Sequence, residues 1–326
     1  MASFNYSDLR SQARRALDRQ ADTAKRLVMI HSGVAIGLGL VLSVLSYLLH
    51  LGIEDTGGLS GIGTRTVLET LQEVLRVVNL VVLPFWTLGY NSMILSVSQD
   101  EPVGVPSLLW GFRHWGVVLR SLLLQGVVYF ALAVVGAQVA SIVFMLTPAS
   151  RALYELAEQM VASGVMDSQT MMDDPAYLAL ASKMLPFLLV GMLVMIVPAF
   201  YRMRFADFAL AQNPEQGALR ALLTSFRLTR KQSFAIFKLD LRFWWFYLAQ
   251  LLIAVLGYGD VLLPMLGVSL GMGADAAMFL FSIAGLACEF GLYVWLKNQV
   301  SATYALAYDQ LRREEEALLQ SLLQEP

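Results

Sequence analysis

The chain has 326 residues, of which 57% are hydrophobic and 15% are charged, and its formal net charge is −2. A soluble globular protein is about 45–50% apolar and about 25% charged. The composition therefore predicts an integral membrane protein, and the near-neutral charge excludes the globally basic surface of a nucleic-acid-binding protein.

The usual signatures of catalytic and metal sites are absent from the sequence. The one cysteine, Cys288, cannot form a disulfide within the chain, and His31, His50 and His114 lie too far apart for a metal-binding pattern. The sequence also lacks a paired nucleophile and base and a phosphate-binding loop that follows a strand. We therefore expect no enzymatic activity, no catalytic residues, no bound metal and no cofactor.

The first 26 residues predict an amphipathic helix on the cytoplasmic face of the membrane. Leu9, Ala13 and Ala16 fall on one side at helical spacing, and the arginines fall elsewhere. Such a helix suits the inner-leaflet interface, where each basic side chain near anionic lipid contributes about 1 kcal/mol. The alternative is a cytosolic helix whose apolar side packs on another part of the protein.

Membrane-spanning segments account for most of the remaining chain, because a span takes about 20 apolar helical residues. Six stretches qualify, and they are Leu27–Leu51, Val77–Val97, Val117–Leu146, Leu185–Tyr201, Leu241–Val261 and Ala276–Leu296. The predicted fold is an all-α polytopic membrane protein with six transmembrane helices. Gly33 and Gly37, which are four residues apart in the first span, predict close packing against another helix.

Basic residues predict the orientation, because lysine and arginine are enriched on the cytoplasmic side of membrane proteins. With the N-terminus inside, only four of the 23 lysines and arginines fall outside, namely Arg65, Arg76, Arg151 and Lys183. We therefore expect both termini to be cytoplasmic.

The longest outer connection, residues 147–184, is acidic and predicts two helices. Ser150 is a candidate cap for the first helix, and Pro175 is placed to begin the second. The acidic side chains favour a solvated face, with binding of a cation or a basic peptide as the alternative.

An internal repeat links the inner connections. The stretch "SQDEPVGVPSLLWGFR" resembles "AQNPEQGALRALLTSFR", with Gln99 matching Gln212, and "TYALAYDQ" after the sixth span resembles "DFALAQNP" after the fourth. We infer a threefold helical-pair repeat, in which each unit has an amphipathic inner-leaflet helix and an out-and-back pair of spans. The predicted divisions are residues 1–26, 27–99, 100–212, 213–310 and a charged cytoplasmic tail, 311–326.

Three stretches carry a family resemblance, and they are "VPAFYRMRFADFALAQNP", "ALLTSFRLTRKQSFAIFKLDLRFWW" and "ATYALAYDQL". They resemble the bacterial six-pass membrane proteins grouped as domain of unknown function nine-seven-five. The similarity is clearest from about Leu185 to Arg313. It implies a six-pass topology and a location in the bacterial cytoplasmic (inner) membrane, and it implies no activity and no site residues.

Glu289 is the main candidate for an intramembrane polar site, because it lies near the middle of the sixth span among apolar residues. An ionised carboxylate there costs a few kcal/mol, and no cation is evident at its depth, so we expect a neutral acid. Gln250 in the fifth span is at matching depth and is the expected hydrogen-bond partner. The alternative is a proton-coupled or cation-binding site, to which Asn91 and Gln125 would be the other polar contributors.

A second candidate is a charge cluster at the inner interface, formed by Lys238, Asp240, Arg242, Arg113 and Arg227. Lys238 and Arg242 share a helix face, which leaves Asp240 to pair with an arginine of another helix. Such a cluster is typical of interfacial anchoring or of locking between repeats, and binding of a lipid headgroup or an ionic substrate is the alternative.

The sequence therefore favours a membrane accessory or scaffold protein that interacts with anionic lipids of the inner leaflet, and with a protein partner or a second copy of the chain. The alternative is a transporter of a small solute, lipid or peptide that uses Glu289.

Overall fold

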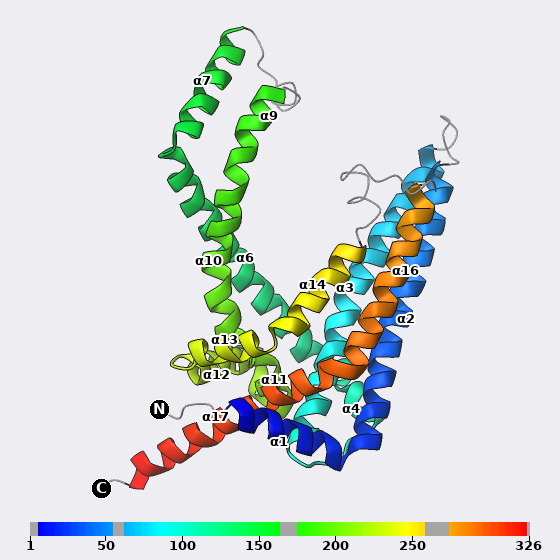
Figure 1. Ribbon diagram of the computed structural model, residues 1–326, viewed down its shortest axis with the longest axis vertical. Coiled ribbons are helices and arrows are strands. Elements are labelled where there is room, and N and C mark those ends of the chain that lie inside the picture. The colour runs from blue at the N-terminus through cyan, green and yellow to red at the C-terminus, as the bar shows by residue number, and fades with distance from the viewer. Residues whose placement is uncertain (1–5, 55–61, 164–174, 258–273, 325–326) are drawn as a thin grey trace. The chain divides into compact units, whose positions relative to one another are not determined.

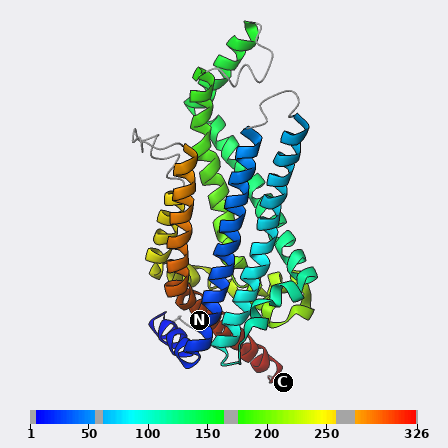
Figure 2. The same cartoon turned by 90° about the vertical axis from the view of Figure 1, so that its right-hand side faces the viewer.

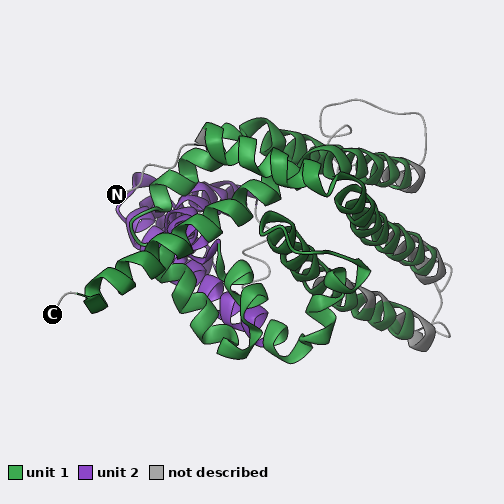
Figure 3. Ribbon diagram, turned by 90° about the horizontal axis from the view of Figure 1, so that it is seen from below, with its two compact units in different colours: residues 1–119, 205–326 green, residues 120–204 purple. Residues whose placement is uncertain are grey.

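The computed structural model describes residues 6–54, 62–163, 175–257 and 274–324 (Figure 1). All regular structure in these ranges is helical. The chain divides into two compact units, of which unit 1 comprises residues 1–119 and 205–326 and unit 2 comprises residues 120–204 (Figure 3). Unit 2 is therefore inserted in sequence between two stretches of unit 1.

Unit 1 contains most of the helices. They are α1 (Tyr6–Arg19), α2 (Ala21–Glu54), α3 (Ile62–Ser98), α4 (Val105–Leu108), α5 (Trp110–Arg113), α11 (Ala206–Gln212), η3 (Pro214–Gln216), α12 (Gly217–Thr229), α13 (Ser233–Arg242), α14 (Trp244–Gly257), α16 (Ala274–Leu292), the π-helical turn η4 (Tyr293–Lys297) and α17 (Asn298–Gln324). α6 (Trp115–Met145) begins in unit 1 and continues into unit 2, which also holds α7 (Pro148–Ala162), α9 (Pro175–Ala181), η2 (Ser182–Met184) and α10 (Leu185–Met203).

Five helical stretches within the described residues are long and apolar enough to cross a membrane. They are Ala21–Leu42, Val81–Ser98, Trp115–Met145, Pro175–Gln212 and Phe279–Gln324. α13 and α14 pass the same test together, which makes six if this bent pair is one span. This is the pattern of a multi-pass membrane protein, and it confirms the predicted all-helical architecture.

The fifth predicted span, Leu241–Val261, is not one straight helix. The chain bends by 67° between α13 and α14, at Phe243. The N–H of Phe243 donates to the carbonyl of Asp240 at 2.9 Å, and the Phe243 ring is buried in the core. The predicted start of the span therefore lies inside α13, and residues 258–261 lie outside the described part of the chain.

The long helices of unit 1 run side by side. α2 contacts α3 and α16, and α14 contacts α16 (Figures 1 and 2). The 34 residues of α2 extend for about 50 Å at 1.5 Å per residue, which exceeds the roughly 30 Å hydrocarbon core of a bilayer. The most densely buried side chains lie at one end of this unit, in the second half of α3, in α11 and in the first half of α17.

Two glycines let the backbone of α3 contact the backbone of the α4–α5 segment directly. A Cβ atom on Gly89 would lie 1.9 Å from the carbonyl oxygen of Leu108, and one on Gly111 would lie 2.1 Å from that of Phe85. Gly33 and Gly37 behave differently, because a Cβ on either would meet nothing within 4 Å. The predicted close packing at these two glycines is therefore wrong for the described structure.

The apolar side of α1 packs against α17. Leu9, Ala13 and Ala16 are only 4%, 0% and 4% exposed. The expectation that this side lies in the lipid interface is therefore wrong, because a protein helix covers it. The same alternation of small apolar and basic residues suits both environments, so the sequence could not separate them.

Unit 2 is held together by a close crossing of α6 and α10. A Cβ on Gly136 would lie 2.5 Å from the carbonyl oxygen of Gly191, so the two backbones touch.

The cap of α7 is Thr147, whose side chain accepts from the N–H of Ser150 at 3.4 Å, and the predicted Ser150 cap is wrong. α9 begins at Pro175 as predicted, and it lies beside α7 (Figure 1).

Candidate functional site

A polar cluster lies inside unit 1 where the end of α16 passes into η4. Glu289, Tyr293 and Lys297 follow one another at intervals of four residues, so they share one side of this helix. The Tyr293 hydroxyl interacts with the side chains of Glu289 and Gln250, and Gln250 belongs to α14. Tyr293 thereby connects the predicted pair, and it joins α16 and η4 to α14.

Lys297 brings a positive charge to the same cluster. Its Nζ atom lies 4.1 Å from the centroid of the Tyr293 ring and 4.9 Å from that of Tyr90, and its charge interacts with that of Glu289. Cation–π contacts of this kind stabilise a desolvated ammonium group. No cation near Glu289 was evident from the sequence, and Lys297, two turns further along the same helix side, is one that interacts with it.

An aromatic stack from α2 and α3 borders the cluster. The His31 ring stacks between Trp86 and Tyr90, with centroid distances of 5.5 Å and 4.5 Å. The Trp86 indole N–H donates to the backbone carbonyl of His31 at 2.9 Å, and the Tyr90 hydroxyl donates to Oδ1 of Asn298 at 2.9 Å. These bonds tie α3 to α2 and to the start of α17.

The other two predicted members of the intramembrane site lie elsewhere. Nδ2 of Asn91 donates to Asp207 of α11 at 3.5 Å, and Nε2 of Gln125 donates to Ser121 of its own helix at 3.2 Å. Gln125 belongs to unit 2, whereas Glu289 belongs to unit 1. Of the four predicted residues, the structure therefore brings Glu289 and Gln250 to a shared partner.

The predicted inner charge cluster is distributed over several contacts. Asp240 is 9% exposed and accepts a hydrogen bond from Tyr247 at 2.9 Å, and the Tyr247 hydroxyl lies 3.2 Å from that of Tyr304 in α17. This chain of groups links α13, α14 and α17. Asp240 thus bonds to a tyrosine, and its predicted pairing with an arginine stays a prediction.

The basic members of that cluster are exposed. Arg227 forms an ion pair with Glu315 of α17, and Nζ of Lys238 lies 4.7 Å from the centroid of the Phe234 ring. Arg113 lies at the end of α5 and Arg242 at the end of α13, and both are exposed to solvent or lipid. Exposed ion pairs of this type contribute about 0–1 kcal/mol each.

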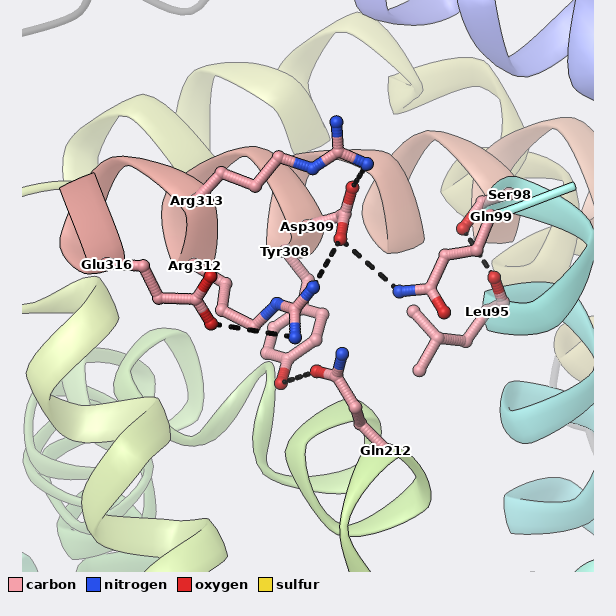
Figure 4. Close-up of polar contacts among 9 residues, drawn as sticks. All are labelled: Leu95, Ser98, Gln99, Gln212, Tyr308, Asp309, Arg312, Arg313 and Glu316. Carbon is pink, nitrogen blue, oxygen red and sulfur yellow. Dashed lines mark hydrogen bonds and ion pairs between the residues drawn. The ribbon is translucent and has the colours of Figure 1, made fainter.

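A third cluster, which the sequence did not indicate, surrounds Asp309 in α17 (Figure 4). Asp309 is 4% exposed, and its carboxylate accepts from Gln99 at 3.3 Å, from Arg312 at 3.3 Å and from Arg313 at 2.6 Å. At the preceding position, the Tyr308 hydroxyl lies 2.7 Å from the side-chain amide of Gln212. The Asp309 cluster therefore fastens the ends of α3 and α11 to α17.

Two cavities have defined linings within the described residues. One of about 520 Å³ lies between α1 and the bend that joins α13 to α14, and one of about 420 Å³ lies between α6 and α10. Glu289 lines neither of them. Among the described side chains, no three histidines, cysteines or carboxylates are grouped closely enough to hold a metal ion.

The family model for proteins of unknown function described as DUF975 matches residues 1–315. The chain belongs to this family. The resemblance noticed between about Leu185 and Arg313 is thereby confirmed and extends over almost the whole chain. No curated protein and no solved structure matches the chain significantly.

Sequence reasoning missed three members of the intramembrane cluster of this DUF975 chain. Tyr293 and Lys297 lie one and two turns after Glu289 on the same helix side, so a search for polar side chains at that spacing would have found them. His31 was considered only as a metal ligand. Its stacking on Trp86 and Tyr90 depends on the pairing of α2 with α3, for which the sequence gives no direct signal.

Proposed function

We propose that this DUF975 protein is a non-enzymatic integral protein of the bacterial cytoplasmic membrane that serves as an accessory or scaffold protein for lipid and protein partners. The observation that carries this proposal is the interaction of Glu289 and Gln250 with a common partner, Tyr293, by which polar groups of two spans join those spans. Hydrogen bonds between spans commonly have this structural role.

The basic side chains support an inner-face location for the lipid contact. All but four of the 23 lysines and arginines lie on the side assigned to the cytoplasm. Because α1 buries its apolar side on α17, its exposed arginines Arg10, Arg14 and Arg15 can face an anionic leaflet, whereas Arg19 pairs with Asp100. Each such side chain near the surface adds about 1 kcal/mol of attraction. A second copy of this chain or another membrane protein is the corresponding protein partner.

The threefold repeat forms part of the same proposal. Gln99 and Gln212 are matched positions of the first two inner connections, and both bond to adjacent residues of α17, Asp309 and Tyr308 (Figure 4). The stretch around Tyr308 is the third matched segment. These two contacts support a threefold repeat whose helical pairs are arranged around a common axis.

Cysteine labelling tests the proposed orientation. In a Cys288→Ala background, a cysteine at Ser163 should react with a membrane-impermeant maleimide in intact spheroplasts. A cysteine at Ser321 should react only after permeabilisation, because α17 ends on the cytoplasmic side. Labelling of both cysteines in permeabilised cells is the control for accessibility. Labelling at Ser321 alone in intact spheroplasts would overturn the inner-face assignment.

Transport of a small solute, lipid or peptide is the second candidate function. The observation that favours it is the gathering of three titratable groups, Glu289, Lys297 and His31, beside a π-helical turn. π-helical turns occur frequently at functional sites. A transporter would need Glu289 to exchange a proton or contact a substrate, so Glu289→Gln would abolish transport without loss of stability.

A further inference from the structure

The cavity of about 520 Å³ in unit 1 is lined by basic residues from two parts of the chain. α1 contributes Ser7, Arg10, Ser11 and Arg14, and the bend between α13 and α14 contributes Arg242 and Trp244. Arg10 and Arg14 are one helical turn apart, so both guanidinium groups lie on the same side of α1. Arg242 is the last residue of α13 and also lines the cavity.

The charge of this cavity favours an anion. None of the described residues that line it is acidic, whereas three are arginines. The nearest carboxylate on α1, Asp8, accepts a hydrogen bond from Gln12 at 3.0 Å and does not line the cavity. Guanidinium groups bind phosphate through paired hydrogen bonds, and serine hydroxyls add further donors.

An exposed apolar stripe leads away from the cavity along α14. Trp244, at the cavity, is 60% exposed, and the residues that continue the stripe are 41–59% exposed, namely Leu248, Leu251, Leu252 and Val255. Their spacing places them on one side of the helix. Tryptophan prefers the membrane–water interface, so the cavity lies where an apolar span meets the headgroup layer.

We infer that this cavity binds the phosphate of an anionic phospholipid whose acyl chains lie along the stripe of α14. This inference rests on the proposed contact with an anionic inner leaflet. The volume lies within the roughly 300–1,000 Å³ range of small-ligand pockets, which accommodates a glycerophosphate headgroup. A choline headgroup would bring a quaternary ammonium against three arginines, so the site should discriminate against zwitterionic phosphatidylcholine. A free phosphate compound would make no use of the apolar stripe.

Native mass spectrometry of the purified full chain tests the site, with titration of phosphatidylglycerol, phosphatidylcholine or soluble glycerol phosphate. The wild type should bind phosphatidylglycerol in preference to phosphatidylcholine. The double variant Arg10→Gln/Arg14→Gln should weaken binding of phosphatidylglycerol by about tenfold or more, because a lost hydrogen bond to a charged group corresponds to a factor of that order. Arg242→Gln, at the end of α13, should weaken the same binding without altering α1.

The matched control is Arg15→Gln/Arg26→Gln, which removes the same charge from exposed positions that do not line the cavity. It should weaken this binding less than the cavity pair does, because it removes only the general attraction of basic side chains to anionic lipid. Equal weakening by the cavity pair and the control pair would overturn the site and leave the general attraction to anionic lipid intact. No preference of the wild type for phosphatidylglycerol would overturn both the site and that proposed contact. Equal binding of glycerol phosphate and phosphatidylglycerol would show that a soluble phosphate compound is the ligand and would overturn the lipid assignment.

Discussion

Gly89→Ala should lower the free energy of unfolding by about 3 kcal/mol. The new methyl group would lie 1.9 Å from the carbonyl oxygen of Leu108, a backbone atom that no side-chain rotation can move. Leu108 is itself fully buried, so α3 and α4 would have to separate within a packed core. Overpacking a core costs about 1–3 kcal/mol or more. Titration with sodium dodecyl sulfate in mixed micelles measures the change.

Gly33→Ala is the matched control for this substitution. It introduces the same methyl group into another long helix, at an exposed position where nothing lies within 4 Å. Alanine is a better helix former than glycine, so this variant should be as stable as the wild type or more stable by up to about 1 kcal/mol. Equal losses of unfolding free energy in the two variants would contradict the account that the close approach of Leu108 makes glycine necessary at position 89.

Asp309→Asn should destabilise the protein by about 2 kcal/mol. The substitution removes the charge that Arg312 and Arg313 share at a position that is 4% exposed. It also places amide hydrogens near Gln99, which donates to one carboxylate oxygen. Breaking a buried pair costs up to about 3–5 kcal/mol, and we expect less because Arg313 is 70% exposed.

Asp8→Asn provides the comparison for Asp309→Asn, because Asp8 is exposed and bonds only locally to Gln12 in the part of the chain that the structure describes. Its free energy of unfolding should stay within about 0.5 kcal/mol of the wild type. Thermal unfolding in detergent, followed by intrinsic fluorescence, compares the two variants. A midpoint for Asp309→Asn equal to that of Asp8→Asn would contradict the role of Asp309 in fastening α3 to α17.

The spans were predictable because hydrophobic length depends on the chain alone, and the helices of the structure contain most of the residues assigned to them. The bend at Phe243 was not predictable, because it depends on the burial of one aromatic ring in a core built from distant segments. The sequence also could not identify what α1 packs against, because the same apolar side of the helix can pack against lipid or against protein. Asp309 belonged to the repeat stretch "TYALAYDQ" just before the charged tail, and its burial beside Gln99 depends on the approach of α3, which the sequence does not indicate.

The intramembrane site was predictable in part. Glu289 and Gln250 could be predicted to lie near each other because they are at matching depths in consecutive spans, and consecutive helices of a membrane protein often pack as pairs. Depth alone could not reveal that Tyr293 lies between them, or that Lys297 supplies a cation. Asn91 and Gln125 were grouped with Glu289 by polarity, and their helices place them in other contacts.

The structural role of the polar residues inside the spans is tested most directly by comparing Glu289→Gln with Glu289→Leu in thermal and sodium dodecyl sulfate unfolding. Glutamine keeps the shape and can still bond to Tyr293, so this variant should match the wild type. Leucine removes the polar interaction of Glu289 with Tyr293, and with it the connection to α14, so it should lower the free energy of unfolding by about 1 kcal/mol, the usual scale for polar interactions between spans. A leucine variant as stable as the wild type would contradict the structural role and favour a function in which Glu289 acts on a proton or a substrate.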